Sequence, residues 1–159
     1  MLFRSFISGI YLLPEHQKKW YHLSWLYPGR SDIGFGDSVA VTDQRIEYFN
    51  LAIADGHEIG SHLNGHFDGS GWSYSQWVEE FDMFDTILFD TFAEPITRNV
   101  QLDLVLEDIQ GIRVPLLAKN DHLYRLLGER GYTYDASRVA PMGTHPWKDR
   151  NGVWQFPLV

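Results

Sequence analysis

The spacing of apolar residues indicates helices and short strands in alternation. Trp77, Phe81, Phe84 and Leu88 recur at intervals of four, three and four, which is typical of the buried face of a helix. Ser75 stands before them as a candidate N-cap. We therefore predict an amphipathic helix that begins at about this serine.

The same reading can be extended along the chain. Two further helices are expected over Thr42–Asp55 and Asp121–Arg130, each followed by a glycine suited to the C′ position, Gly56 and Gly131. Strands are expected at 3–13, 57–62, 100–106, 111–117, 132–134 and 153–158. Alternating strands and helices are the pattern of βα units, so the sequence predicts an α/β fold with a mainly parallel sheet.

The length limits how much of a βα fold is present. One βαβ unit takes about 30 residues or more, and a closed (β/α) barrel takes about 200 to 250. The chain has 159 residues, which suits one domain over 1–159 holding part of a barrel. The chain starts almost within an apolar strand and stops at Phe156–Val159, so we expect a fragment.

Composition excludes several function classes. The formal net charge of −8 disfavours nucleic acid and anionic membrane surfaces as partners. No apolar run approaches the ~20 residues of a membrane span. The first 13 residues suit a buried strand better than a signal peptide. Cysteine is absent, which excludes thiol chemistry and leaves the cellular compartment unknown.

Three histidines occur within Gly56-His-Glu-Ile-Gly-Ser-His-Leu-Asn-Gly-His66. Imidazole is the commonest metal ligand, and His62 and His66 are spaced so that a tight loop could bring both to one ion. Surface or capping histidines are the alternative for such a spacing. His57 lies five strand positions from His62 and so faces the other way, and we interpret it as structural.

Two shorter motifs follow the predicted later strands. Arg113-Val-Pro115 offers a fixed cation that can hold a carboxylate, although for this tripeptide alone an ordinary surface arginine is the favoured explanation. Tyr134-Asp-Ala-Ser137 puts an acid at a strand exit, where an Asx turn or a helix cap is the alternative.

Together these residues resemble the polysaccharide deacetylases of the NodB-homology type. The histidine segment is similar to that family's second motif, with Leu63 in place of the usual hydroxyl residue, and Arg113–Leu116 is similar to its third, with Leu116 in place of an aromatic residue. The likeness extends over Asn120–Asp135 and Gly152–Pro157.

The resemblance implies an incomplete, distorted (β/α) barrel and zinc-dependent removal of an N- or O-acetyl group from a polysaccharide or glycan. It makes His62 and His66 ligands of Zn²⁺ or another divalent metal. It gives Arg113 the role of orienting the catalytic base, and the backbone N–H of Leu116 that of an oxyanion donor.

Two parts of the family pattern are missing. The sequence contains no Asp-Asp pair, which in the family supplies the base and the third ligand, and it stops before the late histidine that acts as general acid. Asp32 and Asp37, in a glycine-rich loop, are poor substitutes because loop acids do not sit at the strand end. We therefore expect weak zinc binding and slow or no turnover.

Two other functions remain open at this stage. The six tryptophans could belong to a non-catalytic carbohydrate-binding module, provided that some are exposed and coplanar. The Tyr134–Ser137 segment also resembles branches of the superfamily that hydrolyse other carbon–nitrogen bonds. The exact substrate and the oligomeric state cannot be read from the sequence.

Overall fold

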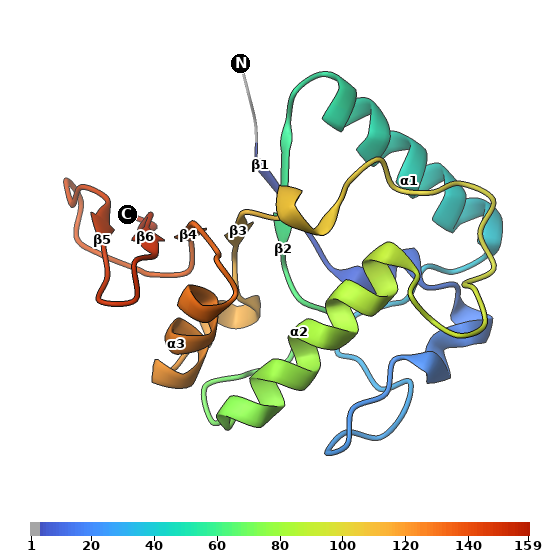
Figure 1. Cartoon of the computed structure of the whole chain (residues 1–159), viewed down its shortest axis with the longest axis horizontal. Helices are drawn as coiled ribbons and strands as arrows, with labels where there is room; N and C mark the ends of the chain where they lie inside the picture. Colours follow the sequence, from blue (N-terminus) through green and yellow to red (C-terminus); the bar gives the residue numbers. More distant parts are fainter. Residues whose placement is uncertain (1–3) are drawn as a thin grey trace.

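The structure is a computed structural model that describes residues 4–159. It contains three α-helices, α1 (Val39–Ala54), α2 (Tyr74–Phe89) and α3 (Asp121–Glu129), and the strands β1 (Arg4–Ile7), β2 (Glu58–Ser61), β3 (Gly111–Ile112), β4 (Tyr134–Asp135), β5 (Trp147–Lys148) and β6 (Trp154–Gln155). Short 3-10 helices cover Gly9–Leu12, Glu15–Trp20, Leu106–Asp108 and Pro115–Leu117. The helices lie to the right of and below the row of strands in Figure 1.

The strands form one sheet in the order β1-β2-β3-β4-β6-β5. Each neighbouring pair from β1 to β6 is parallel, and β5 pairs with β6 in the antiparallel direction. Within the described residues the sheet has two free edges, β1 and β5, and does not close into a barrel. The expected α/β class with a mainly parallel, incomplete barrel is therefore confirmed.

The carboxyl ends of the first four strands meet at one edge of the sheet. The N–H of His62 donates to the carbonyl of Ile7 at 2.8 Å, and the N–H of Arg113 donates to the carbonyl of Ser61 at 3.0 Å. Ala136 continues the ladder by donating to Ile112. The residues that follow β2, β3 and β4 are thus stepped side by side, which is where parallel folds place their chemistry.

Helix α2 packs its predicted face into the core. Trp77, Phe81, Phe84 and Leu88 are all buried, in one cluster with Ile7, Ile59 and Ile112 of the sheet. The predicted start was wrong by two residues, because Ser73 is the N-cap. Its side chain accepts from the N–H of Gln76, and the Gln76 side chain accepts from the N–H of Ser73, which completes a capping box.

The two glycine stops are confirmed. Gly56 and Gly131 have φ values of 81° and 76°, a left-handed conformation that favours glycine after a helix. Helix α1 begins at Val39, three residues before the predicted start, since Ser38 accepts a hydrogen bond from the N–H of Val41 and caps it there.

The strand predicted at 100–106 is wrong. Side chains of helix α1 supply the hydrogen bonds that a neighbouring strand would otherwise make: Asn50 donates to the carbonyl of Gln101 and accepts from the N–H of Asp103. Its alternating apolar residues, Val100, Leu102 and Leu104, nevertheless pack against the core. The alternation of apolar residues therefore predicted correctly which side chains face the core. The backbone bonds to side chains of helix α1 rather than to a neighbouring strand.

The other strands are shorter than predicted, and one was missed. The apolar run that begins the chain stays extended only to Ile7 and then turns into the 3-10 helix Gly9–Leu12; the part of the predicted strand before Arg4 lies outside the described residues. β5 was not predicted. Its two residues, Trp147 and Lys148, pair with β6 and give too short a pattern to recognise. No helix within residues 4–159 is long and apolar enough to cross a membrane.

Candidate functional site

The turn that follows β2 brings His62 and His66 together. Their ring centroids lie 5.2 Å apart, with an angle of 59° between the ring planes. Leu63 and His66 both have left-handed backbone conformations, with φ values of 57° and 60°. These two positions fold five residues into a tight loop, as the Asn64-Gly65 dipeptide predicts, rather than a helix.

This spacing fits a shared metal ion. Two imidazoles that bind one tetrahedral zinc ion at about 2.0–2.1 Å would have ring centroids about 5 Å apart. Both histidine side chains are partly exposed, so an ion and a substrate can reach them from solvent. The donor type and the spacing of the two rings are compatible with zinc.

A backbone hydrogen bond orients the ring of His62. Its Nδ1 lies 2.5 Å from the carbonyl oxygen of Arg113. Because a carbonyl only accepts, Nδ1 carries the proton and Nε2 keeps its lone pair for a metal. Burial lowers the pKa of His62, opposed by the hydrogen bond to the carbonyl of Arg113.

No third ligand joins the pair within residues 4–159: there is no group of three or more His, Cys, Asp or Glu side chains that could hold a metal ion. Asp32 comes near through its backbone, whose N–H donates to the carbonyl of Gly65 at 2.9 Å, but its carboxylate is exposed. Asp37 is also exposed, and its backbone carbonyl accepts from the N–H of Glu15 rather than from the histidine turn. The described donor set is thus two imidazoles.

Arg113 lies beside the histidine pair at the end of β3. Its Nε donates to the carbonyl of Ala136 at 3.2 Å, and its guanidinium lies 5.0 Å from the ring centroid of Phe6. Its own carbonyl accepts from His62. One residue therefore supplies both the acceptor that orients a candidate ligand and a fixed cation close to it.

A buried carboxylate holds the chain that leaves β3. Asp135 accepts from the N–H of Ser137 at 2.9 Å and from its hydroxyl, in the Asx-turn arrangement that was the alternative reading of this motif. The Ser137 hydroxyl accepts in turn from the N–H of Val114 at 2.8 Å. Through Ser137, Asp135 therefore holds the backbone of Val114, the residue next to Arg113. We interpret Asp135 as a structural residue of the site.

Leu116 follows Pro115 in a 3-10 turn. It has a φ of 55° and an exposed side chain. The left-handed φ shows that the backbone of Leu116 is constrained in this turn. The role of its N–H as an oxyanion donor stays a prediction.

His57 lies just before β2, whereas His62 lies just after it. Its N–H donates to the carbonyl of Ala52, at the end of α1. The strand separates His57 from the histidine pair, in keeping with its interpretation as structural.

Sequence reasoning missed Glu80. It is the seventh residue of α2 and is only 1% exposed. Its carboxylate accepts from the hydroxyl of Tyr21 at 2.7 Å and from the N–H of Asn64 at 2.8 Å. One signal was available, because Glu80 stands three residues after Trp77 and four before Phe84, on the apolar face.

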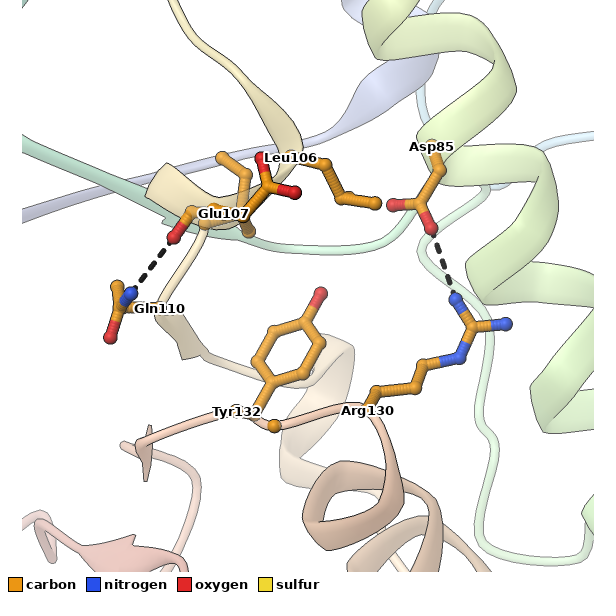
Figure 2. A pocket seen from close by; sticks show the side chains of 8 residues that line it. Asp85, Leu106, Glu107, Gln110, Arg130 and Tyr132 are labelled. Atoms are coloured by element: carbon orange, nitrogen blue, oxygen red, sulfur yellow. Dashed lines mark hydrogen bonds and ion pairs between the residues drawn. The ribbon is translucent and has the colours of Figure 1, made fainter.

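A separate cavity of about 310 Å³ lies between α2, α3 and the segment before β3. Figure 2 shows Asp85 paired with Arg130 on one side and Leu106, Glu107 and Tyr132 around the rest. Burial raises the pKa of Asp85 to about 6, opposed by Arg130. Neither histidine of the pair nor Arg113 lines this cavity, so it is distinct from the candidate site.

The tryptophans do not form an exposed platform. Of the six, all of which lie in the described part of the chain, Trp154 alone is classed as exposed. Trp72 and Trp77 are buried and pack at an angle of 58° to each other. The coplanar, accessible rings that a carbohydrate-binding module needs are not found among these side chains.

Comparison with solved structures identifies the architecture. A protein described as a polysaccharide deacetylase from Mycobacterium smegmatis matches with a TM-score of 0.54 and 22% identity, over 74% of this chain and 37% of its own. The likeness establishes the fold. The expected resemblance to the NodB-type barrel is thus confirmed at the level of architecture.

Two further structures match less closely. The Xyl-CE4 domain of a multidomain xylanase from the hindgut metagenome of Trinervitermes trinervoides has a TM-score of 0.36 and 17% identity, over 52% of this chain and 34% of its own. Puue allantoinase has a TM-score of 0.48 and 19% identity, over 77% and 37%. The chain spans little more than a third of the proteins it matches. No family model and no curated protein sequence matches it.

Proposed function

We propose that this chain carries the histidine half of the metal site of a hydrolase that removes acetyl groups from a carbohydrate. The observation that carries the proposal is the His62–His66 pair, 5.2 Å apart at the carboxyl edge of the sheet, with the ring of His62 oriented by Arg113. The polysaccharide-deacetylase fold of the Mycobacterium smegmatis protein supports the choice of substrate class.

In this proposal the two imidazoles bind a divalent cation, and His62 does so through Nε2 because its Nδ1 bonds to the carbonyl of Arg113. A bound zinc ion supplies Lewis acidity and lowers the pKa of water. Arg113 keeps His62 in the required tautomer through its carbonyl, which leaves Nε2 as the nitrogen available to a metal.

The guanidinium of Arg113 is proposed to hold a carboxylate that acts as general base. A guanidinium is charged at every working pH and can bind a carboxylate through two hydrogen bonds. The backbone N–H of Leu116 is proposed to donate to the oxyanion, a contact that does not depend on the side chain. The sequence lacks the paired aspartates that would provide the base, so we expect the chain alone to act slowly.

This arrangement suggests a chemical rescue experiment. Acetate release from an N-acetylated chito-oligosaccharide is measured with zinc, with and without added formate, which can occupy the place of the missing carboxylate. The expected result is slow, zinc-dependent release that formate increases. His62→Ala should abolish the release, and Arg113→Met should abolish the effect of formate.

The contradicting results are equally definite. Release at the same rate in a chelator or in folded His62→Ala would show that the histidine pair has no part in the reaction. Absence of any zinc-dependent release, with formate present and the protein folded, would remove the deacetylase proposal. Efficient release without formate would show that the chain contains its own base.

A further inference from the structure

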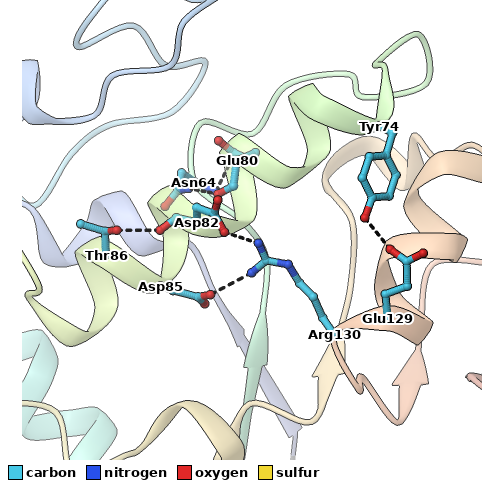
Figure 3. A network of polar contacts seen from close by, with 8 residues as sticks. All are labelled: Asn64, Tyr74, Glu80, Asp82, Asp85, Thr86, Glu129 and Arg130. Atoms are coloured by element: carbon cyan, nitrogen blue, oxygen red, sulfur yellow. Dashed lines mark hydrogen bonds and ion pairs between the residues drawn. The ribbon is translucent and has the colours of Figure 1, made fainter.

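Glu80 lies beneath the turn that carries His62 and His66. Glu80, in α2, is buried, and so is Asn64 at the centre of the turn. The side chains of Glu80 and Asn64 lie next to each other where α2 passes the turn (Figure 3). Glu80, 16 positions further along the chain, thus contacts the middle of the histidine segment.

Three hydrogen bonds join Glu80 to its surroundings. Its Oε1 accepts from the N–H of Asn64 at 2.8 Å, and its backbone carbonyl accepts from the side-chain amide of Asn64 at 3.1 Å. Its Oε2 accepts from the hydroxyl of Tyr21 at 2.7 Å. Glu80 therefore binds both the backbone and the side chain of Asn64, and the hydroxyl of Tyr21 holds the carboxylate of Glu80 in place.

The turn needs such support because its backbone is strained. Leu63 and His66 are not glycines, yet both have left-handed φ values. A left-handed non-glycine residue costs about 1–2 kcal/mol and persists only where its surroundings fix it. Asn64 lies between these two positions, so its contacts with Glu80 act on the conformation that sets the spacing of the two rings.

We infer that Glu80 is a positioning residue for the metal site: by binding Asn64, it holds His62 and His66 at the spacing that a divalent cation requires. The inference rests on the proposed metal-binding role of the two histidines. Outer partners of metal ligands commonly affect affinity by about 10–100-fold. Glu80 acts one step further out, through the backbone of the turn.

The test is the zinc affinity of purified variants, measured by competition with a chromophoric chelator. Glu80→Met keeps the volume and the buried surface but removes the acceptor for Asn64. Glu80→Gln keeps an acceptor oxygen. We expect zinc affinity to fall about tenfold or more in Glu80→Met and to stay within threefold of wild type in Glu80→Gln.

The neighbouring residue provides a matched control. Glu79 has the same side chain on the same turn of α2, but binds the N–H and hydroxyl of Ser24 instead of the histidine turn. Glu79→Met should leave zinc affinity unchanged. Equal losses in Glu79→Met and Glu80→Met would show a charge effect and overturn the positioning role.

The design separates failure of the inference from failure of the proposed function. If His62→Ala binds zinc as wild type does, the metal site itself is wrong. If His62→Ala loses zinc but folded Glu80→Met keeps wild-type affinity, the site stands and the role of Glu80 is overturned. Should Glu80→Met not fold, Tyr21→Phe replaces it: a threefold or greater loss of affinity supports the role, and wild-type affinity overturns it.

Discussion

His62 Nδ1 lies 2.5 Å from the carbonyl oxygen of Arg113, although 51 positions separate the two residues in the chain. The contact joins the exits of β2 and β3, which are also paired through the N–H of Arg113 and the carbonyl of Ser61. The two sequence motifs that suggested a metal site and a fixed cation are therefore parts of one structure. The stability of the surrounding fold depends in part on residues that connect its helices.

Asn120 is one such residue. Its Oδ1 accepts from the indole N–H of Trp77 at 2.9 Å and from the N–H of Leu123, which caps α3, while its amide donates to the carbonyl of Trp72 at 2.8 Å. We predict that Asn120→Ala lowers the free energy of unfolding by about 2–4 kcal/mol, from the lost cap and the unpaired indole N–H.

Urea denaturation provides the measurement for Asn120→Ala. Asn99→Ala is the control, because Asn99 is exposed and its amide bonds only to Asp43 at the surface. Equal effects of the two substitutions would contradict the role of Asn120 as the junction of α2 and α3.

Gly111 provides the space for an aromatic ring on β4. A Cβ placed there would lie 1.8 Å from Cζ of Tyr134, its partner in the parallel ladder. We expect Gly111→Ala to destabilise the protein by about 1–3 kcal/mol or more through overpacking. Gly34→Ala, where a Cβ meets nothing within 4 Å, should have little effect.

A double-mutant cycle checks the cause. If the Tyr134 ring is what an alanine at position 111 meets, Tyr134→Ala should remove most of the additional cost of Gly111→Ala, so the two effects will not add. Additive effects would show that the loss does not come from contact with the Tyr134 ring.

Glu80 should give the protein a pH-dependent stability. Burial raises the pKa of Glu80 from 4.5 to about 7, opposed by hydrogen bonds from Tyr21 and Asn64. The folded state therefore binds the proton more tightly than the unfolded state. The resulting stabilisation is fully present below about pH 4.5 and is lost as pH rises through about 7, with a total change on the order of 3 kcal/mol.

The comparison with Glu80→Gln isolates this effect. Asp85, whose pKa is raised to about 6, titrates in the same range in both proteins, so the difference between them reports Glu80 alone. We expect wild type to lose stability relative to Glu80→Gln between pH 4.5 and 7.5. A difference that stays constant across this range would contradict the raised pKa.

The sequence predicted the elements whose signals are local. The Trp77–Leu88 spacing and the glycines after α1 and α3 depend on neighbouring residues only, and these features are confirmed. The segment 100–106 was predicted wrongly because its hydrogen-bond partners, Asn50 and Asp43, belong to a distant helix.

The candidate site divides in the same way. The turn between His62 and His66 follows from Asn64-Gly65, and the NodB-like fold followed from the motifs. The burial of Glu80 depends on Tyr21 and Asn64, which reach it from two other segments. These partners are distant in the sequence, so no local pattern predicts them.

Zinc titration of the wild-type chain, His62→Ala, His66→Ala and His57→Ala tests the central claim most directly. His57 is the control, because it lies at the opposite end of β2. We predict one zinc ion bound by wild type and by His57→Ala, with affinity reduced more than about tenfold in each of the other two. Equal affinity in all four proteins, each shown to be folded, would contradict a metal site formed by His62 and His66.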